Sequence, residues 1–282
     1  MDCYTYKVIN NSETPLLKNV DVVLILAMED STRFKEDPFI LNLTKQTIIQ
    51  YNKGFKKCNK PSTIISSKQD IVHAYYTAFE YLKEYNNVII LEDDALVINK
   101  DLLVYEKIDA FIATTDFDIF TFGSFGLTSK YSKDFFKFDK SPFNLSKLSY
   151  TCSQATIYSY NTRTKLIEDI SSSNFNRGSI DMCYIADLDK IFTYKYPLIV
   201  QLLPNTENQK TWTNNIFILT IIRLAIALVR LDTKTDCWFL LYFICRNYIS
   251  IITLVLVLIL IISIHYYNIY KMKLVKTNMF II

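Results

Sequence analysis

VDVVLILAM (residues 20–28) and NNVIILEDDALVI (residues 86–98) are the two stretches that decide the fold. Each holds a continuous run of Val, Ile and Leu, which is typical of a strand buried on both faces of a helix-covered sheet. Between them, residues 68–85 carry apolar side chains three and four positions apart and predict an amphipathic helix. LTKQTIIQYNKGF (residues 43–55) also has helical spacing, and PSTIISS (residues 61–67) is expected to form a short strand. Strands and helices therefore alternate, and we expect parallel βαβ units.

The pattern continues as far as residue 202. DFDIFTFGSFG (residues 116–126) predicts a strand and a turn, and residues 152–170 predict a short strand that leads into a helix. Residues 180–202 are expected to form a helix followed by a strand. The predicted fold class is α/β: a Rossmann-type, mostly parallel sheet with helices on both faces, occupying residues 1–210.

Composition argues against several kinds of ligand site. The net charge of the 282 residues is only +3, so charge alone indicates no nucleic-acid partner. The chain has four glycines, too few and too scattered for a Walker A loop or a Gly-x-Gly-x-x-Gly turn, which need glycine where the backbone approaches phosphate. Any phosphate that binds here must therefore be held by a metal ion or by side chains.

The six cysteines are scattered and include no Cys-x-x-Cys pair, which argues against a zinc site and a disulfide framework. We expect reduced, partly buried thiols. The N-terminus lacks a basic region followed by an apolar one, so it does not resemble a secretory signal peptide. Asn-x-Ser/Thr sequons at Asn10, Asn42 and Asn144 arise easily by chance in an Asn-rich chain and do not place the protein in a lumen.

Glu92, Asp93 and Asp94 directly follow the apolar run VIIL. Ligands of open α/β sheets bind at the carboxyl ends of the strands. On an extended strand Glu92 and Asp94 would point to the same side, since side chains alternate with a period of two. Two converging carboxylates repel each other unless a cation neutralises them, and Mg²⁺ or Mn²⁺ does so while also binding the phosphates of a nucleotide-sugar. The alternative is a solvated acidic turn or a carboxylate that caps the next helix.

This stretch resembles the strand-plus-acid signature of glycosyltransferase family 25, the lipopolysaccharide and collagen galactosyltransferase group. V-I-I-L-E-D-D-A is the most specific part of the resemblance, which covers roughly residues 20–202. VVLILAMEDSTRFK resembles the family's opening strand, with Arg33 in the place of its arginine, and VHAYYTAFEYL, with His73, resembles the helix that usually begins Ser-His. SQATIYSYNTRTKLIE, IDMCYIADL and YPLIVQ resemble the later strand and helix, the Asp-bearing helix and the Pro-x-x-x-Gln strand. Val72 stands where the family has serine, and the Gly-Cys that commonly precedes that helix is missing.

The resemblance implies a GT-A-like fold and a metal-dependent glycosyltransferase. Such an enzyme moves a hexose from a nucleotide-sugar, such as UDP-galactose or UDP-glucose, to a hydroxyl of a glycan, lipid or protein acceptor, with Mn²⁺ or Mg²⁺ as cofactor. Glu92 and Asp94 would then bind the metal and the diphosphate, and Asp93 would support the donor sugar or the ribose. Asp181, at the matching position of the Asp-bearing helix, would be the base that faces the acceptor.

Three candidate site residues also have an ordinary structural interpretation. Asp181 could be an acid that interacts with a helix N-terminus. His73, on the border between the polar and apolar faces of its helix, is either a partly buried histidine with satisfied hydrogen bonds or a contact to the nucleotide or phosphate. Arg33 is either a phosphate ligand, a role that suits the guanidinium fork, or an exposed loop arginine.

The C-terminal part of the chain is far more hydrophobic. Residues 237–270 are expected to form a transmembrane anchor, since the stretch from Asn247 to Tyr270 has no Asp, Glu, Lys or Arg and is long enough to cross the hydrocarbon core. Residues 211–236 are either an interfacial helix or a first membrane span, and residues 271–282 are a short basic tail. We expect a C-terminally anchored membrane protein whose catalytic domain faces the cytosol, where nucleotide-sugars are made.

Two other kinds of function fit the same residues. One is a catalytically inactive, membrane-bound carbohydrate-binding or scaffold protein of the same fold. The other is a metal-dependent phosphotransferase or nucleotidyltransferase that uses the same acids.

Overall fold

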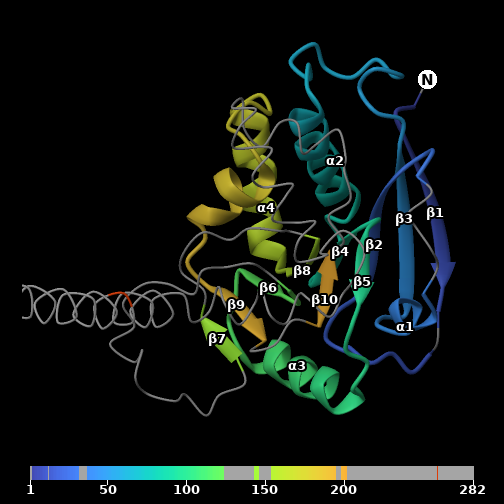
Figure 1. The fold of residues 1–282 in the computed structure, drawn as a ribbon, viewed down its shortest axis with the longest axis vertical. Helices are drawn as coiled ribbons and strands as arrows, with labels where there is room; N and C mark the ends of the chain where they lie inside the picture. Colours follow the sequence, from blue (N-terminus) through green and yellow to red (C-terminus); the bar gives the residue numbers. More distant parts are fainter. Residues whose placement is uncertain are drawn as a thin grey trace, which may run out of the picture. The chain divides into compact units, whose positions relative to one another are not determined.

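The computed structural model of the chain describes residues 2–11, 13–31, 37–123, 143–145, 154–194, 198–201 and 259 (Figure 1). Strands and helices alternate over much of this length, which confirms the predicted α/β class. The elements of these residues are, in chain order, β1 (Tyr4–Asn10), β2 (Val22–Met28), α1 (Pro38–Leu41), β3 (Gln46–Asn52), α2 (Ser67–Tyr81), β4 (Val88–Glu92), β5 (Ala95–Val97), α3 (Leu102–Thr114), β6 (Ile119–Thr121), β7 (Phe143–Leu145), β8 (Ala155–Tyr158), α4 (Tyr160–Ser172), the π-helix η1 (Ile180–Tyr184), the 3-10 helix η2 (Ile185–Asp187), β9 (Ile191–Tyr194) and β10 (Ile199–Gln201).

Eight of the described strands form one sheet in the order β1-β3-β2-β4-β8-β6-β9-β7. At its centre β2 lies between β3 and β4 and is parallel to both, as the βαβ pattern predicts. β6 and β9 are parallel as well, whereas β1, β8 and β7 run antiparallel to their neighbours. The sheet is therefore a mixed one built around a parallel centre.

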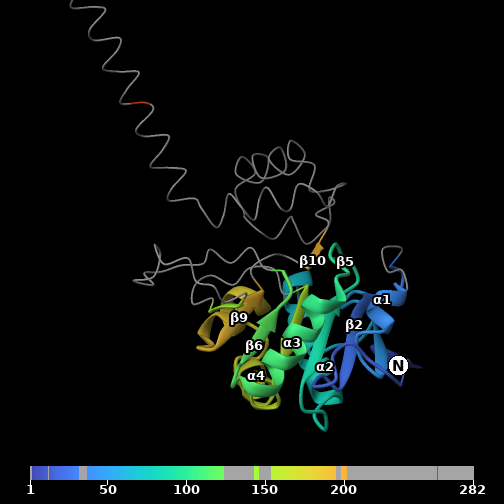
Figure 2. The ribbon, with the colours of Figure 1, turned by 90° about the horizontal axis from the view of Figure 1, so that it is seen from below.

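The strand order reverses within this parallel centre. The chain runs from β2 to β3 on one side and then, through α2, to β4 on the other side of β2. The carboxyl ends of β2 and β4 therefore flank the switch point, which is where open α/β sheets bind their ligands. A separate antiparallel ribbon of β5 and β10 adjoins this edge, because only Asp93 and Asp94 separate β5 from β4 (Figure 2).

The sheet is covered on both faces, and alternate side chains of its central strands enter different cores. On β2, Val23 and Ile25 pack in the core with α1 and α3, whereas Val22 and Leu24 pack in the core with α2 and α4. All four are almost fully buried. Figure 1 shows α2 and α4 together on one side of the sheet and α3 on the other. Burial on both faces explains why the central strands are continuous apolar runs in the sequence.

The structure contradicts two elements expected from the sequence. Residues 43–55 hold strand β3 and not a helix: Ile48 and Ile49 are neighbours, yet both are buried, one in each core. Only a strand buried on both faces sends consecutive side chains into opposite cores, since helical neighbours lie about 100° apart. Residues 61–66 form turns that lead into α2 and not a strand, and the side chain of Ser66 caps that helix.

Cys3 and Cys58 form a disulfide, so the expectation of reduced thiols is wrong for this pair. Their Cα atoms lie 5.6 Å apart although 55 residues separate them in the sequence. The pairing of β1 with β3 explains the approach, because Tyr4 lies opposite Asn52 and the N–H of Lys53 donates to the Cys3 carbonyl. The sequence did not predict β1, and without that strand the proximity could not be foreseen.

Both segments of the expected hydrophobic anchor lie outside the described residues, apart from Ile259. Within the part of the chain that is described, no helix has the length and apolar character needed to cross a membrane. The transmembrane helix within residues 237–270 therefore stays a prediction.

A buried arginine closes the carboxyl end of α2. Arg163 of α4 is 1% exposed and donates to the backbone carbonyls of Leu82, Tyr85 and Asn86, the first at 2.5 Å and the last at 3.0 Å. These carbonyls follow the end of a helix, where backbone acceptors have no partner within the helix. Burial lowers the pKa of Arg163 to about 10, so the side chain stays charged at neutral pH. Arg163 thus joins α2 to α4 over the sheet.

We expect Arg163→Met to lower the free energy of unfolding by on the order of 3 kcal/mol, because three carbonyl groups lose their charged donor. Chemical denaturation of the full chain measures this loss. Arg177→Met is the matched control: the ion pairs of Arg177 with Asp169 and Asp187 are partly exposed, so their loss should cost less than about 1 kcal/mol. Equal losses in the two variants would contradict the structural role of Arg163.

Candidate functional site

Glu92 ends the central strand β4 and continues the row of side chains that faces α2. Val88 and Ile90 precede it at intervals of two and pack in the core with α2 and α4. From that core Tyr75, a fully buried residue of α2, donates its hydroxyl proton to Glu92 Oε1 at 3.0 Å. Glu92 therefore lies at the carboxyl end of β4 on the α2 side of the sheet.

Asp93 and Asp94 form the turn that follows, and each residue is only 9% exposed. β4 ends at Glu92, so the alternation of an extended strand does not continue to Asp94. The expectation that Glu92 and Asp94 lie on one extended strand is therefore wrong. The turn instead brings Asp94 to the β5–β10 ribbon, where Gln201 Nε2 donates to Asp94 Oδ2 at 2.9 Å.

Gln201 reaches the acidic turn because of the register of this ribbon. β10 pairs antiparallel with β5, and Gln201 lies opposite Ala95, the residue directly after Asp94. β10 is also joined to the end of β6, since the N–H of Leu198 donates to the Phe122 carbonyl at 2.7 Å. The ribbon is thus joined to the sheet in two places: β5 follows the acidic turn at the end of β4, and β10 bonds to the end of β6.

Gly123 makes the close approach of β10 possible. A Cβ at this position would lie 2.0 Å from the backbone oxygen of Ile199, so a side chain does not fit there. Gln154 holds Gly123 in place. The side-chain amide of Gln154 donates to the Gly123 carbonyl at 2.5 Å, and the backbone carbonyl of Gln154 accepts from the N–H of Glu92 at 2.9 Å. Contacts therefore connect Glu92 to Gln154, Gln154 to Gly123, and Gly123 to β10, which in turn bonds to the acidic turn.

The sequence assigned no role to three polar residues of this site. Tyr75 belongs to the apolar face of the helix, and the spacing predicts only that such a residue packs in the core. Gln154 and Gln201 stand in SQATIY and YPLIVQ, two of the segments that resemble family 25, and this was the one signal that could have singled them out. Their partners could not be predicted, since 107 residues separate Gln201 from Asp94.

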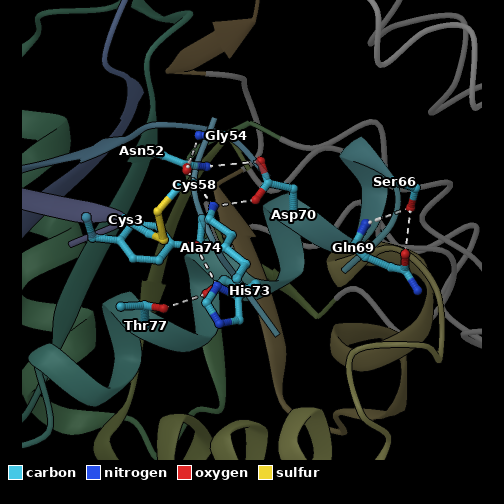
Figure 3. A network of polar contacts seen from close by, with 12 residues as sticks. Cys3, Asn52, Gly54, Cys58, Ser66, Gln69, Asp70, His73, Ala74 and Thr77 are labelled. Carbon is cyan, nitrogen blue, oxygen red and sulfur yellow. Dashed lines mark hydrogen bonds and ion pairs between the residues drawn. A yellow bond between two sulfur atoms is a disulfide. The ribbon is translucent and has the colours of Figure 1, made fainter. Parts of the chain in front are cut away.

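His73 belongs to a second polar cluster, near the start of α2 (Figure 3). The Tyr4 hydroxyl lies 2.6 Å from His73 Nδ1. Beside this pair, buried Lys60 and Asp70 form an ion pair, and Lys60 also donates to Asn52 Oδ1 at 2.6 Å. Burial, assisted by the positive charge of Lys60, lowers the pKa of His73 to about 4. At neutral pH the imidazole is therefore uncharged, and its Nδ1 shares a hydrogen bond with the Tyr4 hydroxyl.

The roles of His73 and Arg33 as contacts to a nucleotide-sugar stay predictions. A neutral His73 would bring no positive charge to a phosphate. Arg33 lies outside the described residues.

Asp181 lies in the first turn of the π-helix η1. The turn before η1 contacts the start of α2, where the Gln69 side chain donates to Asn176 Oδ1 at 3.3 Å. Ile180 packs in the core with α2 and α4, so η1 lies on the side of the sheet to which Glu92 points. This placement is compatible with a carboxylate that faces a ligand at the edge of the sheet.

Glu92 and Asp94 supply the oxygen ligands that Mg²⁺ and Mn²⁺ take. Among the residues that the structure describes, no group of three or more His, Cys, Asp or Glu side chains is arranged to hold a metal ion. A cation at this turn would therefore complete its coordination with water or phosphate oxygens, as Mg²⁺ commonly does when one or two carboxylates bind it. The chemistry of these two oxygen donors is compatible with such an ion.

Fold and site together define an α/β protein with a buried acidic turn at the switch point of its sheet. No protein-family model and no curated protein matches the chain. The likeness to glycosyltransferase family 25 therefore rests on the quoted sequence segments, and the function is argued from those segments and from the site.

The neutral state of His73 leads to a prediction about pH. Its pKa of about 4 in the folded protein lies below the ordinary value of 6.5, so between these values the unfolded chain binds a proton that the folded chain does not. Stability should therefore fall as the pH drops through this window. The decrease in unfolding temperature between about pH 7.5 and about pH 5 should be smaller in His73→Gln than in the wild type.

His265→Gln, which removes the other histidine of the chain, is the control and should keep the wild-type dependence on pH. If the curves of wild type and His73→Gln ran parallel, His73 would not be the group responsible.

Proposed function

We propose that this chain is a metal-dependent glycosyltransferase of the family-25 type, with a GT-A-like fold, anchored to a membrane by residues 237–270. It would move a hexose from a nucleotide-sugar to a hydroxyl of a glycan, lipid or protein. The observation that carries the proposal is the acidic turn at the carboxyl end of β4, where Glu92 and Asp94 each accept a hydrogen bond from a different element. This turn lies at the switch point, the usual ligand site of open α/β sheets.

The convergence of distant segments supports the proposal. V-I-I-L-E-D-D-A, SQATIY and YPLIVQ resemble family 25 separately, and in the fold they meet: the Glu92 N–H donates to the Gln154 carbonyl, and the Gln201 amide donates to Asp94. These contacts bring the three segments together at the acidic turn. The mixed α/β sheet is compatible with the fold that the resemblance implies.

On the donor side, Glu92 and Asp94 would hold Mn²⁺ or Mg²⁺ together with the diphosphate of UDP-galactose or UDP-glucose. The ion supplies Lewis-acid stabilisation of the charge that develops on the departing diphosphate. Asp93, between the two ligands, would support the donor sugar or the ribose.

On the acceptor side, Asp181 would act as the general base. The acceptor hydroxyl oxygen forms a bond to the anomeric carbon while the bond from that carbon to the phosphate oxygen breaks. The hydroxyl proton passes to the Asp181 carboxylate, and the nucleoside diphosphate leaves with the electron pair of the broken bond.

A screen of UDP-hexoses with Mn²⁺, using the purified full chain, tests the reaction, and Asp94→Asn tests the site. The substitution removes one of the two charges that would hold the cation, so Mn²⁺-dependent turnover should fall by at least about 100-fold. Circular dichroism and melting temperature should stay close to wild type, because asparagine keeps the shape of the side chain and an acceptor for Gln201.

Asp30→Asn is the matched control, because Asp30 is an exposed acid that follows the neighbouring strand β2 and pairs with Lys57. Full turnover in Asp94→Asn would remove these acids from the mechanism. In the wild type, sugar binding without turnover would favour an inactive binding protein, and transfer of a nucleotide or phosphate would favour the other enzyme class.

Asp181→Asn should reduce transfer to the acceptor by about 10²- to 10⁴-fold and leave UDP-hexose binding unchanged, since a general base acts only on the acceptor proton. Loss of an acid at a helix start would cost only about 0.3–1 kcal/mol of stability. Asp187→Asn, at the end of η2, is the control. Normal transfer together with a lower melting temperature would show that Asp181 is structural.

A further inference from the structure

The two outer acids of the turn accept hydrogen bonds from uncharged donors in two different parts of the fold. Tyr75 of α2 donates its hydroxyl proton to Glu92 at 3.0 Å, and Gln201 of β10 donates its side-chain amide to Asp94 at 2.9 Å. Tyr75 is fully buried, and the pairing of β10 with β5 fixes the backbone of Gln201. Each carboxylate is therefore oriented by a rigid neighbour.

Both donors are uncharged, and this determines how their hydrogen bonds affect the two carboxylates. A lysine or arginine would orient a carboxylate and also cancel its charge, whereas a phenol hydroxyl and a primary amide orient it and bring no charge. The bonds from Tyr75 and Gln201 thus hold the acids in place without weakening their attraction for a cation. Carboxylates that bind metals are commonly hydrogen-bonded in this way, and loss of such a partner typically costs about 10- to 100-fold in metal affinity.

We propose that Tyr75 and Gln201 are positioning residues of a divalent-cation site at Glu92 and Asp94. The proposal rests on the proposed function, because it assigns these two residues to the metal that the acids would hold. It makes cation affinity depend on α2 and β10 as well as on β4. The close contact of Gly123 with Ile199, which seats β10, becomes part of the same support.

Binding of Mn²⁺ alone to the full chain in detergent, followed by the electron paramagnetic resonance of free Mn²⁺, tests this proposal. Tyr75→Phe and Gln201→Leu each remove one donor and keep most of the side-chain volume. The Kd for Mn²⁺ should rise about 10- to 100-fold in each variant. Melting temperature and circular dichroism establish that the variants are folded.

Tyr85→Phe and Gln46→Leu are the matched controls. The Tyr85 hydroxyl donates to Gln46 Oε1 at 2.8 Å at the amino end of β3, whereas the acidic turn lies at the carboxyl end of the parallel strand β4. These variants should lose stability and keep the wild-type Kd for Mn²⁺. A larger Kd in the two site variants alone supports the proposal.

Two other outcomes would overturn it, and they can be told apart. If Asp94→Asn abolishes Mn²⁺ binding while Tyr75→Phe and Gln201→Leu bind like the wild type, the positioning role is wrong and the proposed metal site stands. If the wild type does not bind Mn²⁺, or Asp94→Asn binds it equally well, the proposed metal site fails and the positioning role fails with it.

The disulfide between Cys3 and Cys58 carries a second, independent inference. It ties the start of β1 to the loop between β3 and α2. The same loop is held by buried Lys60, which bonds to Asn52 and Asp70. Disulfides form and persist in oxidising compartments and are rare in the cytosol, where thiols are kept reduced.

We infer that this domain folds in an oxidising compartment, opposite to the cytosol-facing orientation expected from the sequence. The Asn42 sequon then becomes informative, because Asn42 is exposed at the end of α1. In a eukaryotic host this asparagine is an acceptor for a glycan only if the domain enters the secretory lumen.

Alkylation of free thiols in intact eukaryotic cells that produce the full chain, followed by mass spectrometry of unreduced peptides, tests the inference. Cys3 should be found linked to Cys58, and Cys183 should be alkylated. A glycosidase should shift the mobility of the wild type more than that of Asn42→Gln. Cys3→Ser should lower the melting temperature by roughly 4–16 °C, with Cys183→Ser as control. Complete alkylation of Cys3 and Cys58 would overturn the inference.

Discussion

Alternate side chains of β4 enter two different cores, one with α2 and α4 and the other with α1 and α3. Because both faces are occupied, the strand cannot shift its register by one residue without exchanging every side chain between the cores. Glu92 takes its direction from this alternation. It is the first residue of the α2-facing row that is not apolar, and the hydroxyl of buried Tyr75 meets it there. The packing that stabilises the sheet therefore also places the acid.

Two-sided burial decides how much of the fold could be predicted from the sequence. β2 and β4 were predicted correctly because every position is apolar up to the strand end. β3 was mistaken for a helix because its buried face includes Gln50, which is tolerated there since its amide donates to the Ala74 carbonyl at 3.0 Å. β1 was missed because it is a mostly exposed edge strand, whose support comes from pairing with β3 and gives no apolar run of its own.

The sequence also predicted where the site lies, but not which residues contact its acids. A buried strand that ends in three acids located the turn, because that pattern is local. The partners of the acids are not local: Gln201 is 107 residues from Asp94, and its position depends on the contact that only a glycine at residue 123 permits. The period of two failed at Asp94 for a local reason, since the strand ends at Glu92 and the chain turns. Sequence patterns give the faces of strands but not the geometry of the turns after them.

Asp70 and Asp94 are both buried acids, but only Asp94 belongs to the proposed site. Their exposed fractions are 6% and 9%. Asp70 pairs with Lys60, whose ammonium also lies 4.4 Å from the centre of the Tyr4 ring and bonds to Asn52, so the charge of this acid is balanced within the fold.

Asp94 stands beside Glu92 and Asp93, and the bonds from Gln201 and Tyr75 bring no positive charge to this turn. Gathering carboxylates away from water costs free energy unless a cation balances them. In the proposed function a divalent cation would balance the charge of the acidic turn, whereas Lys60 balances that of Asp70.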